Sequence, residues 1–209
     1  MQENAIFRIA SQTKAIVSVA VLQLVEQGRI GLEDPVEMYI PAFSGQKVYV
    51  KQADTLLLVD RKRSITIRDL LTHQSGISSA DEYPYLQKEF VKFGLSNSGF
   101  EEYPNLSAEI AQIAKMPLAH QPGVRFSYGL STNVLGGLIE LITKQSLSNY
   151  LADNIFKPLG MEDTYFYLPK SKHNRLVEIY VKQDNRLIAA DRTKMPVDYP
   201  LLNNATYFS

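Results

Sequence analysis

The chain has 209 residues, no cysteine, and 22 basic against 22 acidic residues. This length suits one domain or a large piece of one, and an apolar fraction of 45% is enough for a packed core. The balanced charge gives no reason to expect nucleic-acid binding. The absence of cysteine excludes disulfides, a thiolate nucleophile and a thiolate metal site.

The longest apolar run, residues 15–25, is interrupted by Ser18 and Gln23. It is too short to span a membrane and predicts a buried helix instead. The three histidines are scattered, with no His-x-x-x-His pair, so we expect neither a zinc site nor any other cofactor.

The first predicted helix covers residues 11–27 and ends at Gly28, a residue type that commonly follows a helix. Its apolar residues occur on nearly every side, which is typical of a helix at the centre of a core. Ser11 and Lys14 stand at its start, three residues apart, so their side chains share one face. Free backbone N–H groups at a helix start favour a developing oxyanion, and a nearby lysine can hold or relay the proton of a serine nucleophile.

Two observations weigh against this interpretation when the pattern is taken alone. Ser11 could be only a helix N-cap, since serine is favoured there. The Ser-x-x-Lys pattern also occurs a second time, from Ser44 to Lys47, in a loop with no apolar helix behind it. The pattern therefore needs support from the rest of the chain.

The segment from residue 36 to residue 105 predicts short elements joined by loops. We expect helices over residues 36–39, 67–72 and about 85–92, and strands over residues 48–50 and 56–59. Thr66 is the expected N-cap of the helix at residues 67–72, and Asp69 suits its first turn. Residues 78–105 are rich in Ser, Asn, Tyr, Pro and Gly and predict a long surface excursion that could wall a pocket.

The second half of the chain predicts helices followed by strands. The expected helices are residues 107–115, 132–143 and 147–155, and the expected strands are residues 164–168, 176–181 and 186–190. Gly136 and Gly137 lie inside the second of these helices and indicate a close backbone contact there. Residues 183–185 would join the last two strands as a hairpin.

Taken together, these segments resemble the serine β-lactamase-like superfamily, which contains class C β-lactamases, DD-peptidases and related esterases. Four stretches in the family's order carry the resemblance: residues 7–14, 70–77, 122–131 and 156–164. Each motif alone is short, but their order and rough spacing agree over nearly the whole chain.

The resemblance implies a role for each of three residues. Ser11 would be the acylated nucleophile, Lys14 would hold the proton network beside it, and Tyr128 would act as the general base. Without the resemblance, Tyr128 would be taken for a core aromatic, one of 12 tyrosines. The resemblance makes His73 a structural residue that hydrogen-bonds a turn rather than a member of a catalytic triad.

The chain departs from the family pattern at two places. Many family members have Tyr-x-Asn, whereas Leu130 holds the third position here, which favours ester or small-amide hydrolysis over β-lactam hydrolysis. The family's third motif, Lys-Thr-Gly or His-x-Gly, follows the tyrosine, but no glycine follows Gly160 in this chain.

We therefore expect an α+β, mostly helical chain: the helical region of the β-lactamase/transpeptidase-like fold with most of the antiparallel sheet missing. Residues 1–209 would form one partial domain, with the nucleophile helix at 11–27, a mostly helical region at about 28–160 and a strand-containing tail at 161–209. The first helix would then expose apolar surface unless a partner covers it, so self-association or a swapped dimer is expected.

The sequence thus predicts a serine hydrolase that acts through an acyl-enzyme on an ester or amide, with esters favoured. We expect this fragment alone to be weak or inactive. The alternatives are a penicillin-recognising enzyme, a catalytically inactive binding module on the same scaffold, and a structural fragment without function of its own.

Overall fold

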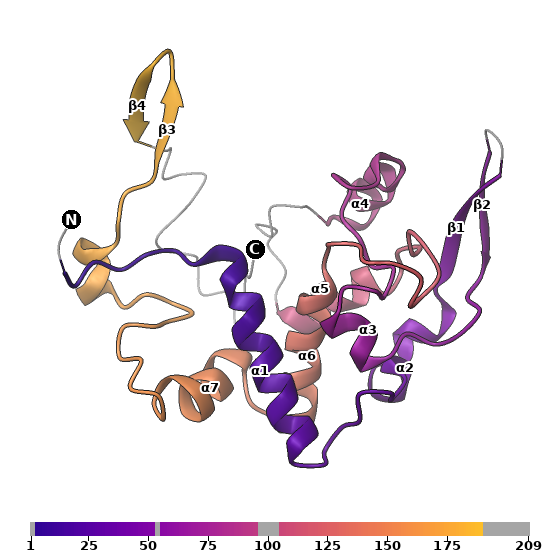
Figure 1. Ribbon diagram of the computed structural model, residues 1–209, viewed down its shortest axis with the longest axis horizontal. Coiled ribbons are helices and arrows are strands. Elements are labelled where there is room, and N and C mark those ends of the chain that lie inside the picture. The colour runs from indigo at the N-terminus through magenta and orange to yellow at the C-terminus, as the bar shows by residue number, and fades with distance from the viewer. Residues whose placement is uncertain (1–2, 53–54, 96–104, 190–209) are drawn as a thin grey trace.

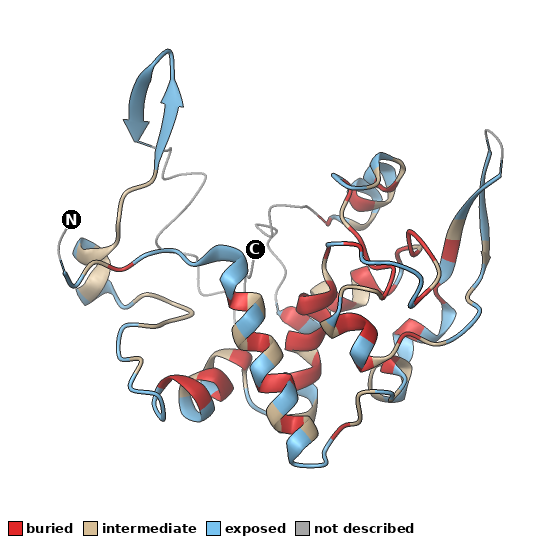
Figure 2. Cartoon of the chain, viewed as in Figure 1, coloured by how far each residue is buried: buried red, intermediate tan, exposed pale blue. Residues whose placement is uncertain are grey.

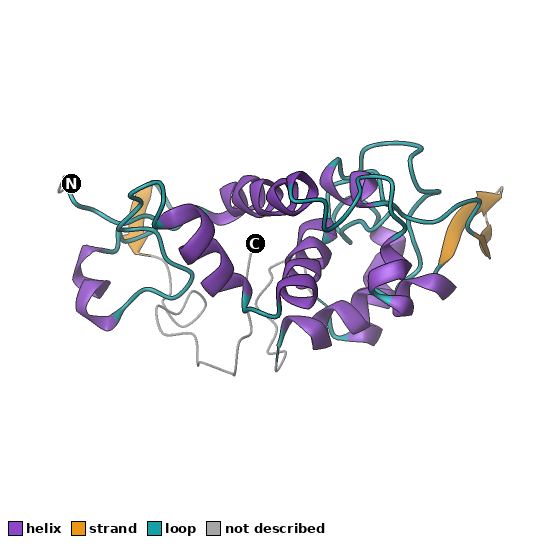
Figure 3. Ribbon diagram, turned by 90° about the horizontal axis from the view of Figure 1, so that it is seen from below, coloured by secondary structure: helices purple, strands orange, loops and turns teal. Residues whose placement is uncertain are grey.

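The computed structural model describes residues 3–52, 55–95 and 105–189. The chain is mostly helical, with one small hairpin near each end of an elongated molecule (Figures 1 and 3). Helix α1, Thr13–Glu26, lies between α6, Ser131–Thr143, and α7, Leu147–Leu151. The predicted mostly helical α+β class is confirmed.

Helix α1 begins two residues later than predicted, because a 3-10 turn at Ala10–Gln12 precedes it. Such turns are frequent at helix ends. Gly28 ends the helix with a φ of 67°, as its residue type predicts. One side of the helix is exposed (Figure 2), and Val19 and Leu22 are 48% and 47% exposed. The helix thus presents apolar surface, as expected from the sequence.

The opposite side of α1 forms the centre of the core. Val17, Ala20, Val21 and Leu24 are fully buried there. They pack against α6, whose buried residues belong to the same hydrophobic cluster. Burial of each CH₂ group contributes about 0.8 kcal/mol. The apolar contact with α6 is therefore the main interaction that holds α1 in the fold.

Two adjacent glycines let α6 approach its neighbours closely. A Cβ at Gly137 would lie 1.9 Å from Ile110 Cδ1 of α5, Leu106–Ile113. A Cβ at Gly136 would lie 2.9 Å from Leu147 Cδ2 of α7. The close contact predicted from this glycine pair is therefore confirmed, and α7 continues as a π-helical turn at Ala152–Phe156.

Each hairpin forms its own two-stranded antiparallel sheet. Strands β1, Lys47–Gln52, and β2, Thr55–Asp60, pair with Val48 opposite Val59. Strands β3, Tyr180–Gln183, and β4, Arg186–Ala189, pair with Tyr180 opposite Ala189. Asp184 and Asn185 both have positive φ, at 48° and 63°, as a two-residue type I′ turn requires.

The helices predicted at residues 36–39, 67–72 and about 85–92 are present, and three 3-10 turns that were not predicted accompany them. They are α2 Val36–Tyr39, η2 Pro41–Gly45, α3 Ile67–Leu71, η3 Pro84–Leu86, α4 Gln87–Phe93 and η5 Lys170–Arg175. Thr66 caps α3 as expected: its hydroxyl accepts from the Asp69 N–H, and the Asp69 carboxylate accepts from the Thr66 N–H. This reciprocal pair is a capping box.

Two strand predictions in the tail need correction. Residues 164–168 form no strand, because no neighbouring backbone in the described chain pairs with them. The strand predicted at residues 176–181 begins only at Tyr180. Leu176 instead forms an isolated parallel bridge with Ile6, which ties the N-terminal segment to this part of the chain. Residue 190 lies outside the described residues.

Candidate active site

Ser11 and Lys14 meet at the start of α1, as their spacing predicts. Ser11 lies in the 3-10 turn and is exposed, and Lys14 Nζ donates to Ser11 Oγ over 3.2 Å. Ala10, immediately before the serine, has a φ of 44°. The Ser11 N–H belongs to the first turn of this helical segment, where backbone N–H groups lack an acceptor within the helix and can donate to an oxyanion instead.

Tyr128 reaches the same point from a segment 117 residues away. Its hydroxyl lies 2.7 Å from Ser11 Oγ, a hydrogen bond in which either oxygen can donate. Lys14 Nζ lies 5.0 Å from the centre of the Tyr128 ring, within the range of a cation–π interaction. The structure thus brings together all three residues that the sequence predicts for the site.

The lysine and the serine change the acidity of the phenol. Partial burial raises the pKa of Tyr128, but hydrogen bonding to Lys14 and Ser11 and the charge of Lys14 outweigh it. The net effect is a pKa below the ordinary tyrosine value, because a positive neighbour favours the phenolate. The side chain remains 43% exposed, so the phenol also faces the outside of the molecule.

The backbone around Tyr128 is held tightly against the segment that follows α3. The Ser127 N–H donates to the His73 carbonyl over 2.7 Å, and the Ser79 N–H donates to the Tyr128 carbonyl over 3.2 Å. A Cβ at Gly129 would lie only 2.6 Å from the Ile77 carbonyl oxygen. Glycine is therefore required at position 129 for these two segments to pass at this distance.

His73 has a part in the site that the sequence reasoning missed. Its carbonyl supports the turn before Tyr128, in agreement with the structural role expected, but its imidazole Nδ1 has no partner among the described residues. The ring instead stacks on Tyr128, with centroids 5.2 Å apart and an angle of 23° between the planes. Nothing in the local sequence connects a histidine with a tyrosine 55 residues later.

The second Ser-x-x-Lys copy has no such surroundings. Lys47 forms an ion pair with Asp60 across the β1–β2 hairpin, and the Ser44 carbonyl accepts from Arg61. No tyrosine hydroxyl bonds to the Ser44 hydroxyl in the part of the chain that the structure describes. The helix, the lysine and the tyrosine together distinguish the Ser11 copy from this one.

Leu130, at the position where many family members have asparagine, is partly buried and packs against the hydrophobic core. It therefore supplies neither an amide to hold Lys14 nor one to bind a substrate carbonyl.

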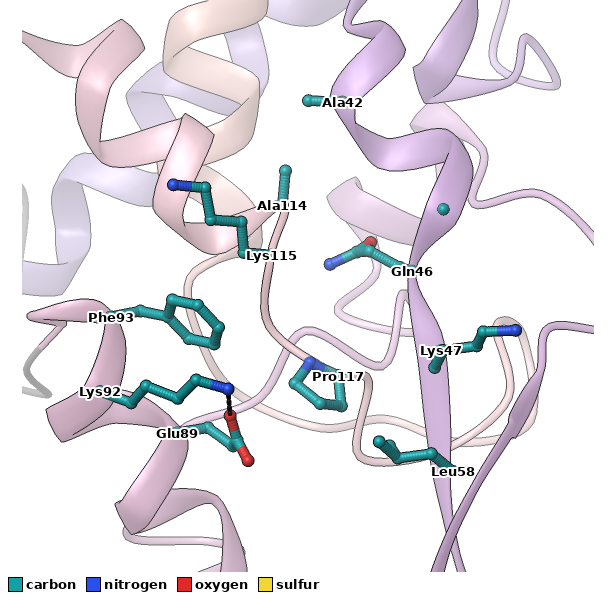
Figure 4. A pocket seen from close by; sticks show the side chains of 11 residues that line it. Ala42, Gln46, Lys47, Leu58, Glu89, Lys92, Phe93, Ala114, Lys115 and Pro117 are labelled. Atoms are coloured by element: carbon teal, nitrogen blue, oxygen red, sulfur yellow. Dashed lines mark ion pairs between the residues drawn. The ribbon is translucent and has the colours of Figure 1, made fainter.

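A hollow of about 480 Å³ lies on another part of the molecule, between α4 and the start of β1 (Figure 4). Lys92 forms an ion pair with Glu89 at its edge, and Lys47 points away from it. Ser11, Lys14 and Tyr128 are not among the residues that line this hollow.

Over the described ranges, no cluster of three or more His, Asp or Glu side chains could hold a metal ion. Within the same ranges, no helix has the length and apolarity needed to cross a membrane.

Comparison with known proteins identifies the family of this chain. The Beta-lactamase family model matches residues 1–201, and the chain belongs to this family.

Two similar proteins have names that describe ester or acyl-transfer chemistry. Esterase EstB of Burkholderia gladioli is 32% identical over 169 residues, which cover 79% of this chain and 40% of the esterase. ML-236A carboxylate methylbutanoyltransferase mlcH of Penicillium citrinum is 33% identical over 170 residues, covering 80% of this chain and 39% of the relative.

The solved structure of unliganded simvastatin synthase (LovD) from Aspergillus terreus matches with a TM-score of 0.76 at 26% identity, over 98% of this chain and 50% of that chain. The predicted β-lactamase/transpeptidase-like fold is therefore confirmed. The chain spans half or less of the length of these three proteins.

Proposed function

We propose that this chain carries the nucleophile of a serine acyl-transfer enzyme that forms an acyl-enzyme at Ser11 and acts mainly on esters. The observation that carries the proposal is the hydrogen bond of 2.7 Å between the Ser11 and Tyr128 hydroxyls, with Lys14 Nζ 3.2 Å from the same serine oxygen. A nucleophile and a base within hydrogen-bond reach, with a third group that orients them, are what covalent catalysis requires.

The proposed reaction has two halves. In the first, Ser11 Oγ attacks the substrate carbonyl while the Tyr128 phenolate takes the serine proton and passes it to the leaving alkoxide. In the second, Tyr128 takes a proton from water or from an acceptor alcohol as its oxygen attacks the acyl-enzyme, and returns that proton to Ser11 Oγ as the serine leaves. Lys14 keeps its positive charge beside the phenolate throughout, and the Ser11 N–H donates to the oxyanion, a contact typically worth about 3 kcal/mol.

Two observations favour an ester over a β-lactam as the substrate. Leu130 packs into the core and offers no amide to bind the carbonyl of an amide substrate. One relative is named an esterase and another a methylbutanoyltransferase, and neither name mentions a β-lactam. Transfer of the acyl group to an alcohol is therefore the second candidate activity, and the transferase relative is its support.

The test uses a fluorophosphonate probe and three substrates on the purified chain. We expect the probe to label the protein at Ser11, and the label to be lost in Ser11→Ala but kept in Ser44→Ala, the matched serine of the second motif copy. A short-chain nitrophenyl ester should be cleaved faster than a chromogenic cephalosporin, and an added alcohol should yield a new ester if transfer occurs.

The alternatives give different results in the same test. Faster cleavage of the cephalosporin would identify a penicillin-recognising enzyme. A folded protein that is not labelled at Ser11 would favour an inactive binding module or a structural fragment, and the acyl-enzyme proposal would fail.

We further propose that the exposed apolar side of α1 is covered by a second copy of this chain in solution. Val19 and Leu22 lie on this side, each close to half exposed. The proposal is consistent with the octameric penicillin-binding protein homologue from Pyrococcus abyssi, which matches 89% of this chain with a TM-score of 0.62.

A further inference from the structure

The ring of His73 occupies an unusual position beside the candidate base. It lies 5.2 Å from the Tyr128 ring and 5.6 Å from the Phe126 ring, centroid to centroid. The three aromatic side chains thus form a row in which His73 is the middle member. Since Phe126 and Tyr128 are 61% and 43% exposed, the half-buried His73 is the most enclosed of the three.

The backbone of His73 is equally specific. Its φ of 53° lies in the left-handed region, where histidine is tolerated better than most side chains other than glycine and asparagine. This conformation turns the carbonyl of residue 73 toward the Ser127 N–H, which it accepts over 2.7 Å. One residue therefore contacts the Tyr128 segment twice, through its carbonyl and through its ring.

The placement of the phenol needs such support. The Tyr128 hydroxyl has to remain within hydrogen-bond distance of Ser11 Oγ while a large part of its side chain faces outward. The Lys14 side chain contacts the ring but is itself a flexible chain. The imidazole is half-buried and has fewer rotatable bonds than the lysine side chain, so it is the more rigid of the two contacts.

We propose that His73 is a positioning residue for Tyr128: its imidazole is the platform that holds the phenol beside Ser11 and Lys14. This inference rests on the proposed function for its effect on rate, but the position and acidity of the phenol can be measured without any activity. Burial and the charge of Lys14 both lower the pKa of His73, so the platform is neutral near pH 7. Glu82 opposes this effect but does not reverse it.

The test compares three variants of the whole chain. His73→Asn keeps a residue that tolerates left-handed φ and removes the aromatic ring. His73→Phe restores a ring without ring nitrogens. His120→Asn is the matched control, because His120 is more deeply buried than His73, also has a pKa lowered by burial, and also has one ring nitrogen without a partner in the described structure.

The first measurement is the pKa of the Tyr128 phenol, followed by NMR on protein with ¹³C-labelled tyrosine. Tyr128→Phe identifies the signal among the 12 tyrosines. We expect His73→Asn to raise this pKa toward the ordinary value of about 10, because the unsupported phenol moves away from Lys14. His120→Asn should leave it unchanged, and His73→Phe should restore most of the lowering.

The second measurement is the rate of fluorophosphonate labelling per folded molecule. We expect His73→Asn to slow labelling by about 10- to 100-fold, as misplacement of a catalytic group by about 1 Å does. A merely structural His73 would lower the melting temperature without moving the phenol pKa or the rate of the folded fraction.

The outcomes separate this inference from the proposed function. An unchanged Tyr128 pKa in folded His73→Asn overturns the positioning role, whether or not the chain is active. If the wild-type chain is not labelled at Ser11 while His73→Asn still shifts the phenol pKa, the proposed function fails and the positioning role stands. Should His73→Phe fail to fold at this left-handed position, His73→Asn against His120→Asn decides the question.

Discussion

The charge of Lys14 acts on the site mainly through the neighbouring phenol. Tyr128 has a pKa below the ordinary tyrosine value because the influence of Lys14 and Ser11 exceeds the opposing effect of burial. A base works in its ionised form, so the rate of Ser11 acylation should rise with pH as Tyr128 loses its proton. The midpoint of this rise should fall below the ordinary tyrosine value of about 10.

Replacement of Lys14 by methionine removes the charge and keeps much of the side-chain length. We expect Lys14→Met to raise the Tyr128 pKa, so that the acid limb of the pH–rate profile moves to higher pH. Each unit of this shift lowers the phenolate fraction near neutral pH about tenfold. Lys47→Met, in the second motif copy, is the control and should leave the pH–rate profile unchanged. If the unsubstituted chain, Lys14→Met and Lys47→Met all gave the same profile, the role of Lys14 would be refuted.

The backbone at residue 129 passes close to residues 77–78, and this contact links the fold to the site. A Cβ at Gly129 would meet backbone atoms of Ile77 and Ser78 at 2.6 Å, and backbone cannot rotate out of the way as a side-chain tip can. We expect Gly129→Ala to cost about 1–3 kcal/mol of unfolding free energy and to reduce labelling of Ser11, because Tyr128 must shift with its neighbour. Urea unfolding and probe labelling measure the two effects.

Gly45→Ala is the matched control for that substitution. A Cβ at Gly45 would meet nothing within 4 Å, so the change in stability should stay within about 0.5 kcal/mol. If both alanine variants were equally stable, the contact at residue 129 would not be a constraint on the fold.

The cap of α3 carries an ion pair whose contribution depends on pH. The Asp69 side chain is 5% exposed and binds both Arg63 Nη1 and Nη2, at 2.5 and 2.8 Å. Burial raises the pKa of Asp69, but Arg63 and Thr66 lower it by more. Its pKa in the folded chain thus lies below the unfolded value of about 3.9, so its stabilising effect is complete above that pH and is lost as pH falls through the folded pKa.

We therefore expect Asp69→Asn to cost about 1–3 kcal/mol of stability at pH 7, and the deficit to shrink below about pH 4, where the wild type loses the same contribution. Urea unfolding at a series of pH values measures it. A deficit that stayed constant down to pH 3 would contradict the ion-pair explanation.

These elements also indicate what the sequence can predict. The Thr66–Asp69 cap, the Ser11–Lys14 spacing and the glycine pair of α6 are local patterns, and all three were predicted. The pairing of Ser11 with Tyr128 spans 117 residues and was reached only through resemblance to a family. The stack of His73 on Tyr128 and the absence of a strand at residues 164–168 depend on which segments lie side by side, which no local pattern specifies.

For the whole molecule, the exposed side of α1 predicts concentration-dependent association. Contiguous apolar surface in water favours burial against another surface. We expect size-exclusion chromatography with light scattering to give a mass above that of one chain, and the double variant Val19→Gln/Leu22→Gln to shift the protein toward the monomer. The control variant Val91→Gln changes a residue of α4 that is 71% exposed, and it should not shift the protein toward the monomer. A stable monomer for the unsubstituted chain would overturn the expectation.

The left-handed backbone of Ala10 has a consequence for engineering. An alanine at φ 44° holds the turn before Ser11 in a conformation that glycine adopts far more easily. Ala10→Gly should therefore gain roughly 1 kcal/mol of stability in the folded chain, offset in part by the extra freedom of the unfolded one. The same change would relax the reactive turn, so a variant selected for heat resistance at this residue would be expected to react more slowly.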